Sequence, residues 1–219
     1  MLKSTNKIIK VLAGSDVLLL TGFGFVSPIF AIFVSQNIVS GDPAKAAEVA
    51  GFSMAIYWIV KSALQIPIGN YLDKNHGEKD DIIFIMAGNF LAALAVFGYI
   101  FSQTAWHIYL CQVIYSLGMA MNIPAWTAVF TRHIDKGKEA FEWATRSTFV
   151  GIGAGSAGAL GGIIVANFGF NFLFVVIGIF VLLSAILPVL ILKEISPRDE
   201  KALSAPATKM VQETHLPKS

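Results

Sequence analysis

The hydrophobic residues of this chain are gathered into six stretches, and the polar and charged residues are concentrated between them and after the last one. Each stretch is close to the ~20 apolar residues that an α-helix needs to cross the hydrocarbon core of a bilayer. Glycines and prolines inside such stretches are tolerated, because neighbouring groups satisfy the freed backbone. The pattern therefore predicts an all-α membrane protein with six transmembrane helices, at residues 11–34, 49–72, 82–101, 107–130, 143–168 and 170–192.

The segments outside these helices differ from them in composition. Residues 1–10 are basic, and residues 193–219 are polar, rich in Pro, Ser, Lys and Glu and without periodicity, which is typical of a disordered tail. The basic segment and the first apolar stretch together resemble a secretory signal peptide. That stretch is longer than a signal-peptide core, and no small-residue cleavage pattern follows it. We therefore expect residues 11–192 to form one six-helix bundle.

Cations are confined almost entirely to one side of the predicted helices. They precede the first helix and follow the second, fourth and sixth, whereas the loops on the other side carry only Lys45. Loops rich in lysine and arginine stay on the cytoplasmic side of a membrane. We therefore expect both termini in the cytoplasm, and we expect a multi-pass protein of a prokaryotic cytoplasmic membrane.

Composition narrows the classes of function. The chain has 219 residues, of which 55% are hydrophobic and 14% are charged, whereas soluble domains carry about a quarter charged residues. The net charge is +2 and no basic patch is present, which argues against a nucleic-acid partner. The single cysteine, Cys111, lies inside an apolar stretch and cannot form an intrachain disulfide. A soluble enzyme and a nucleic-acid-binding protein are both disfavoured.

The second predicted helix carries a ridge of polar residues at four-residue spacing. Residues four apart lie on nearly the same face of a helix, so the ridge is one slowly winding strip. We expect the part of the ridge nearer the start of the helix to line a solute pathway. The ridge consists of Tyr57, Lys61, Gln65, Gly69 and Asp73, and the first three are assigned to the pathway.

Lys61 lies near the middle of this helix, twelve residues from Val49 and twelve from Asp73. At about 1.5 Å per residue it is about 18 Å from either end, too far for its side chain to reach the membrane surface. A charge at that depth costs roughly 2.5–3.5 kcal/mol on insertion scales, so it should face protein or a water-filled space. Lys61 is either a structural lysine bonded to a neighbouring helix or a cation of the substrate site, and we favour the second interpretation. Its charge indicates an anionic or zwitterionic solute, or a carboxylate partner.

The fourth predicted helix carries a second strip, polar and aromatic where a lipid-facing surface would be aliphatic. Its members, at spacings of three and four, are Gln112, Tyr115, Met119, Asn122 and Trp126. A cavity wall explains the strip, and we assign all of it except Met119 to the solute pathway. The alternative is a seam in which Gln112 and Asn122 hydrogen-bond across a helix interface, and for Asn122 both interpretations stay open.

Small residues recur along the fifth predicted helix. Gly151, Gly155, Gly158 and Gly162 lie along one side and allow two helix backbones to approach closely, which predicts a packing face. A catalytic role for Ser156 within this run is rejected, because the sixth helix has no histidine to act as its base. We expect no enzymatic activity.

Ionisable side chains within the other helices are few. Asp16 is the only acid of the first helix and lies about 9 Å inside its cytoplasmic end. Arg146 lies at a similar depth in the fifth helix, so the two are predicted to form an ion pair. The four histidines are at or beyond helix ends and show no ligand spacing, so neither a metal site nor a cofactor is expected.

The turn after the second helix has a distinctive order: a small residue, an acid four positions later, a cation, a glycine and a second cation. It resembles the loop between helices two and three of the major facilitator superfamily, with one extra residue before the glycine. We predict that the turn acts as a conformational latch, because its acid lies at the cytoplasmic end of the second helix, where the fifth helix of a paired bundle would begin. The matching residues are Gly69, Asp73, Lys74, Gly77 and Lys79.

Two further helices are similar to the same family, with departures. In the fourth helix, Gln112, Gly118 and Pro124 fall where the family has an arginine, a glycine and a proline. The basic residue associated with proton coupling in the family's antiporters is therefore replaced by glutamine. In the fifth helix, residues 153–162 resemble the glycine-rich antiporter motif, with Ala-Gly where Gly-Pro is expected.

The resemblance implies the amino-terminal bundle of such a transporter, built as an inverted three-plus-three repeat. The first and fourth helices would line a central pathway, and the third and sixth would face lipid. Alternating access requires two bundles that rock against each other about a midplane site. We therefore expect a half-transporter for a small solute that pairs with a second six-helix bundle, in the first place another copy of itself, with uniport or substrate-linked symport favoured over proton antiport. The alternative is a non-transporting sensor or scaffold, or an inert fragment of a full-length transporter.

Overall fold

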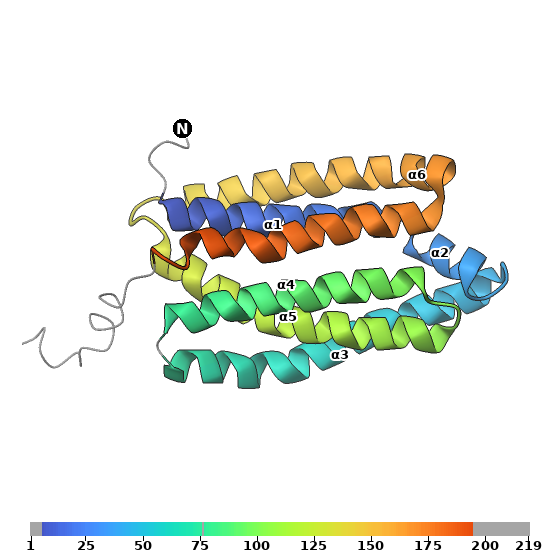
Figure 1. The fold of residues 1–219 in the computed structure, drawn as a ribbon, viewed down its shortest axis with the longest axis horizontal. Helices are drawn as coiled ribbons and strands as arrows, with labels where there is room; N and C mark the ends of the chain where they lie inside the picture. The colour runs from blue at the N-terminus through green and yellow to red at the C-terminus, as the bar shows by residue number, and fades with distance from the viewer. Residues whose placement is uncertain (1–5, 76, 195–219) are drawn as a thin grey trace, which may run out of the picture.

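The computed structural model describes residues 6–75 and 77–194. Within these ranges every regular element is a helix, and the long helices run side by side along one axis (Figure 1). Residues 1–5, and the predicted tail from residue 195 on, lie outside the described ranges. The helices are α1 (Lys7–Val26), α2 (Phe30–Asn37), α3 (Pro43–Asn75), α4 (Glu78–Ile100), α5 (Ala105–His133), α6 (Glu139–Ile186) and the 3₁₀ helix η2 (Leu187–Ile191).

The element α6 consists of two helices joined at a reversal of the chain. Gly169 has φ 79° and ψ 173°, a conformation that glycine adopts at little cost because it has no Cβ. The first arm of α6, residues 139–168, and its second arm, residues 170–186, run in opposite directions (Figure 1). In the described chain five helices are long and apolar enough to cross a membrane. With the reversal inside α6, they correspond to the six predicted passes.

The prediction of one uninterrupted helix over residues 11–34 is wrong. α1 ends at Val26, and α2 is a separate helix of eight residues that begins at Phe30. Pro28 lies between them, and its missing N–H and its ring both prevent a helix from continuing. The N–H of Ile29 instead donates to the carbonyl of Val26 at 3.0 Å, which closes a tight turn.

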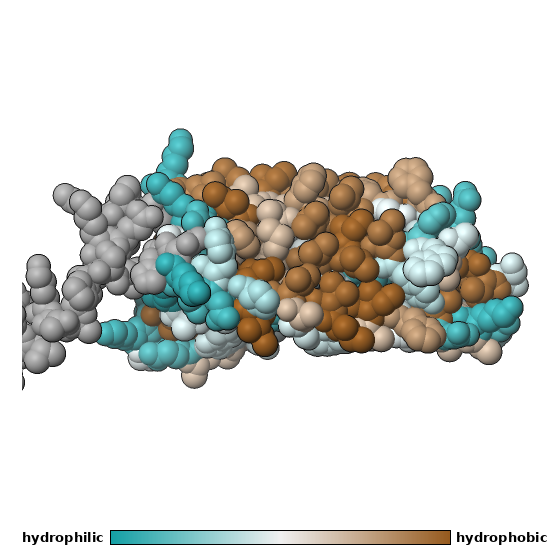
Figure 2. All heavy atoms as spheres, turned by 90° about the horizontal axis from the view of Figure 1, so that it is seen from below, coloured by the Kyte–Doolittle hydropathy of each residue, from teal (hydrophilic) through white to brown (hydrophobic). Residues whose placement is uncertain are grey.

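Apolar side chains form a band across the middle of the molecule, and hydrophilic residues gather at both ends (Figure 2). Several of the largest exposed side chains are aliphatic, including Ile59 at 68% and Ile66 at 72% exposure. A band of this kind would be unstable in water and matches the hydrocarbon core of a bilayer. The start of α1 and the end of η2 lie at the same end, where Lys7 forms an ion pair with Glu194.

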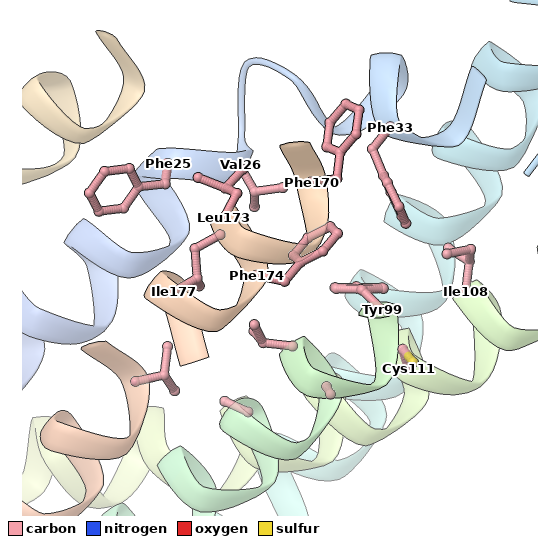
Figure 3. Close-up of a cluster of buried hydrophobic side chains, with 14 of the residues drawn as sticks. Phe25, Val26, Phe33, Tyr99, Ile108, Cys111, Phe170, Leu173, Phe174 and Ile177 are labelled. Atoms are coloured by element: carbon pink, nitrogen blue, oxygen red, sulfur yellow. The ribbon is translucent and has the colours of Figure 1, made fainter. Parts of the chain in front are cut away.

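Aromatic rings fill the core near α2 (Figure 3). Phe33 of α2 lies edge-on to Phe174 of the second arm of α6, with ring centroids 4.8 Å apart. Tyr99 of α4 lies 5.4 Å from the same phenylalanine. Edge-on pairs add about 0.5–1.5 kcal/mol beyond the burial of their area, so this cluster holds α2 against the end of the bundle.

A chain of buried hydrogen bonds crosses the centre of the bundle. Ser15 Oγ of α1 donates to the carbonyl of Ser184 at 2.7 Å, and Asn89 Nδ2 of α4 approaches the same carbonyl at 3.3 Å. Asn122 Nδ2 of α5 donates to Asn89 Oδ1 at 2.7 Å. All four side chains are at most 3% exposed. The side chains of Ser15, Asn89 and Asn122 each have a partner from another helix, which fixes the rotation of four helices relative to one another.

Glycines set the spacing between helices at two crossings. A Cβ on Gly88 of α4 would meet the carbonyl oxygen of Gly118 on α5, so these two backbones touch. At the other crossing, a Cβ on Gly24 of α1 would lie 2.7 Å from Cα of Ala154, and a Cβ on Gly161 would meet the carbonyl of Phe25. The first arm of α6 thus packs on α1 through positions near Ala154 and Gly161.

The predicted packing face of this arm is therefore rotated in the structure. Gly151, Gly155 and Gly162 face open space, with no atom within 4 Å of an added Cβ. Of the four predicted glycines, only Gly158 approaches α1, with the carbonyl of Gly24 3.5 Å from an added Cβ. The spacing of the glycines indicates a face of this arm that is rich in small residues. In the structure α1 packs against the neighbouring face of the arm.

The α1–α6 crossing generates a stability prediction. Gly161→Ala should destabilise the folded bundle by about 1–3 kcal/mol, because the new methyl group has no room beside the Phe25 carbonyl. Gly155→Ala is the matched control: it has open space and should gain up to about 1 kcal/mol from helix propensity. Thermal unfolding in detergent, followed by tryptophan fluorescence, should give a lower Tm for the first variant only. Equal Tm values for both variants would contradict the close crossing.

Candidate functional site

A cavity of about 380 Å³ opens between the ridge of α3 and the strip of α5, toward the end of the bundle that carries α2. We call it the upper cavity. Its walls are mainly aromatic, with a few hydroxyl and amide groups and no charged side chain. The lining residues are Phe23, Val26, Ser27, Phe30, Ala31, Ala50, Ser53, Met54, Tyr57, Tyr99, Gln112 and Tyr115.

Three of the predicted pathway residues meet in this cavity. Tyr57 of α3 and Tyr115 of α5 stack with centroids 5.1 Å apart and an interplanar angle of 20°. Phe23 of α1 packs on Tyr115 at 4.5 Å. Gln112 lies one turn before Tyr115 on α5 and lines the same cavity. The ridge and the strip therefore face each other, as two walls of one space.

Lys61 lies one turn beyond Tyr57 on α3 and is only 6% exposed. Its Nζ is 3.6 Å from the centroid of the Trp58 ring and 4.9 Å from that of Tyr57. A cation over an aromatic face gains about 0.5–2 kcal/mol, depending on its desolvation. Within the described part of the chain Lys61 has no ion-pair partner. Its ammonium group is thus packed against aromatic rings of its own helix, one of which, Trp58, is itself 54% exposed.

A second cavity, of about 470 Å³, lies along the same α3–α5 seam toward the opposite end. We call it the lower cavity. Gln65, Gly69 and Asp73 of the ridge line it, and Pro124 and Arg132 of α5 form part of the other wall. Tyr57 lines the upper cavity and Gln65 the lower one, so Lys61 lies between the two along α3.

Two of the predicted pathway residues lie elsewhere. Asn122 forms the buried bond to Asn89, so the structure favours the seam interpretation for this residue. Trp126 is 4% exposed, donates from Nε1 to the carbonyl of Leu12 at 3.1 Å, and stacks on Phe130 with centroids 4.5 Å apart. Neither residue lines the upper or the lower cavity. Both polar groups are satisfied by neighbouring helices, which explains why they point into the core.

The predicted pair of Asp16 and Arg146 is brought together. Arg146 Nη2 lies 2.6 Å from Asp16 Oδ2, and the carboxylate side chain is 8% exposed. The guanidinium carbon also lies 4.6 Å from the Trp126 ring centroid and 5.7 Å from that of Trp143. The pair therefore joins α1 to the first arm of α6 beside an aromatic cluster, and its charges are compensated inside the bundle.

The predicted latch surrounds the end of α3 and the start of α4. Asp73, Lys74 and Lys79 are exposed, and Gly77 precedes the first turn of α4. Asp73 has no ion-pair partner among the described residues, although its carboxylate lines the lower cavity. Its role as a latch stays a prediction.

A cluster of charges that the sequence reasoning missed lies beside this turn. Arg132 at the end of α5 donates from Nε to Glu78 Oε1 at 3.1 Å and also pairs with Asp81. His133 Nε2 lies 3.5 Å from Glu78 Oε2. Both carboxylates are at most 5% exposed. The sequence feature that could have revealed this cluster is the presence of acids in the first turn of α4 and bases in the last turn of α5, both of which the helix dipole favours.

The part of the chain that the structure describes contains no group of three or more His, Cys, Asp or Glu side chains arranged to hold a metal ion. The upper cavity offers aromatic, hydroxyl and amide groups with a nearby cation. These walls can pack against a small molecule and offer it hydrogen bonds, while Lys61 does not line the cavity and lies one turn further along α3.

The sequence profile of the Major Facilitator Superfamily matches residues 12–217, which is most of the chain. No curated protein matched the chain in the comparison. The profile match spans all the helices after the start of α1, together with both cavities. The membrane-crossing helices and the profile agree, and the family implies transport of a solute across a membrane. The chain belongs to the Major Facilitator Superfamily.

Proposed function

We propose that this chain transports a small solute by alternating access, as one bundle of a two-bundle transporter, and that the α3–α5 seam is its wall of the pathway. The observation that carries the proposal is the pair of cavities along one seam with Lys61 between them. A site near the midplane that opens alternately to either side is what such transporters require. The exposed cations at the end that carries the start of α1 support placing both chain ends in the cytoplasm.

The packing of the helices supports an inverted repeat. α1 packs mainly on α6, and α3 packs mainly on α5. In a three-plus-three repeat, passes one to three correspond to passes four to six. The contact of α1 (pass one) with the first arm of α6 (pass five) is then equivalent to the contact of α5 (pass four) with α3 (pass two). Both contacts are present in the bundle, which is the arrangement expected of a three-plus-three repeat.

We propose a second copy of the chain as the other bundle. In the window searched for membrane spans, only 17% of α3 is buried, whereas half of α4 and half of α5 are buried. The open glycines of the first arm of α6 lie on another exposed helix. Closed twofold symmetry is the commonest form of self-association, and it would place α3 of one copy against α6 of the other.

The chemistry of the seam favours an anionic or zwitterionic solute. Lys61 has no carboxylate partner in the described chain, and no acid lines the upper cavity. A solute carboxylate would supply the missing counter-charge, while the tyrosines pack on its apolar part. Asp16 is already paired with Arg146, so proton antiport through this carboxylate is disfavoured relative to uniport or solute-linked symport.

Uptake into proteoliposomes tests the role of Lys61. A panel of labelled monocarboxylates and amino acids should reveal flux with the unchanged chain, and Lys61→Met should reduce it about 10- to 100-fold, because a charged hydrogen bond contributes about 1.5–3 kcal/mol. Lys45→Met, in an exposed position outside the cavities, is the control and should leave flux unchanged. Normal flux with Lys61→Met would make this lysine a structural residue. Absence of flux from the unchanged chain would favour a sensor or scaffold.

Self-association is tested with bulky residues on the open glycine face. Gly151→Leu and Gly155→Leu add side chains where the bundle itself has free space, so they should leave the monomer folded and weaken the dimer at least several-fold. Val175→Leu, on the exposed second arm of α6, is the control. Single-molecule photobleaching of labelled protein in bilayers measures the fraction of pairs. Transport by a chain shown to be monomeric would overturn the two-copy proposal.

A further inference from the structure

A third cavity, of about 390 Å³, lies between α1 and the first arm of α6, near the starts of both helices. We call it the α1–α6 groove. Apolar side chains such as Val17 and Phe149 form most of its walls, and Lys10, Glu142 and Arg146 bring charge to it. None of these residues lines the upper or the lower cavity, so the groove is separate from the solute pathway proposed above.

Glu142 leaves one buried acceptor unused in this groove. Its side chain belongs to a residue that is 3% exposed, and Oε2 accepts only a long hydrogen bond, 3.4 Å, from the N–H of Asp135. Oε1 is buried and has no hydrogen-bond partner in the described chain. A buried carboxylate oxygen without a donor is costly, so a donor from outside the protein is expected at this position.

Arg146 leaves a buried donor unused in the same groove. Its Nη2 binds Asp16, and its Nε is buried without a hydrogen-bond partner among the described residues. Glu142 and Arg146 are one helical turn apart but do not form an ion pair with each other. The groove is thus lined by two residues, one helical turn apart, that have an unpaired acceptor and an unpaired donor, and the exposed Lys10 adds a second cation.

We propose that the groove binds a phospholipid whose headgroup carries a primary ammonium group next to its phosphate. The ammonium donates to Glu142 Oε1, and the phosphate accepts from Arg146 Nε and from Lys10. The acyl chains lie along Val17 and Phe149. A trimethylated headgroup has no N–H and leaves Glu142 unsatisfied, so the groove discriminates between ethanolamine and choline headgroups.

The location of the groove favours a lipid over a soluble zwitterion. It lies at the ends of two helices that cross the membrane, where headgroups meet the hydrocarbon core, and its walls are largely apolar. A soluble zwitterion would satisfy Glu142 and Arg146 but would leave the apolar walls uncovered. Acyl chains cover those walls and are already present at this depth.

Native mass spectrometry of the purified full chain tests the proposal. Phosphatidylethanolamine and phosphatidylcholine with identical acyl chains are titrated into the detergent-solubilised protein. The ethanolamine lipid should bind at least about 10-fold more tightly, as expected for charge-assisted hydrogen bonds. Glu142→Gln should reduce this preference to under about threefold. Glu139→Gln, which neutralises an exposed carboxylate at the start of the same helix, should retain it.

A second variant and a soluble probe complete the test. Val17→Trp fills the groove and should abolish the preferential binding while the protein still elutes as a folded species. Phosphoethanolamine without acyl chains should not displace the lipid at equal concentration. Equal binding of the two lipids, a preference that survives both Glu142→Gln and Val17→Trp, or displacement by the soluble headgroup would each overturn the proposal.

Discussion

The contact between the backbones of α4 and α5 at Gly88 and Gly118 is the constraint on which much of this bundle depends. Only glycine leaves the carbonyl of one helix free to touch the backbone of the other. The next residue along α4, Asn89, then lies within hydrogen-bond distance of Asn122. Asn89 also approaches the Ser184 carbonyl, which accepts from Ser15. One close crossing thus sets the position of a polar chain that reaches four helices.

The location of these polar groups decides which parts of the molecule are available for function. The serines and asparagines of the central chain are hydrogen-bonded within the bundle, and the charge of Asp16 is paired with that of Arg146. Polar groups without such partners lie along the α3–α5 seam and in the α1–α6 groove. Because α3 is the least covered of the long helices, the seam is also where a second bundle has the most to contribute. The polar groups that hold the helices together and the polar groups proposed to bind ligands therefore lie in different parts of the bundle.

Much of the architecture could be predicted from the sequence because bilayer thickness and charge distribution constrain it strongly. The six passes follow from apolar length, and depth along the helix was enough to match Asp16 with Arg146. The break at Pro28 was missed because proline is tolerated in membrane helices and the apolar stretch runs through it. At Pro28 the helix ends and a tight turn follows, whereas a proline tolerated inside a helix would only have bent it.

The candidate site was less predictable, because a polar strip does not reveal what covers it. Tyr57, Gln112 and Tyr115 do meet in one cavity, whereas Asn122 and Trp126 of the same strip are satisfied by neighbouring helices. The rotation of a helix about its axis depends on contacts between segments far apart in sequence. The Arg132 cluster was missed for the same reason: Arg132 is 51 residues from Asp81 and 54 residues from Glu78.

In the proposed transporter the ridge of α3 faces an aqueous pathway. Single cysteines introduced along α3 in a Cys111→Ala chain, reconstituted in liposomes and exposed to a membrane-impermeant maleimide, test this orientation. Labelling is expected at Tyr57, Gln65 and Gly69, and protection at Ile59 and Ile66 on the apolar face, which gives a helical periodicity. Protection along the whole of α3, or labelling of the apolar face instead, would contradict it.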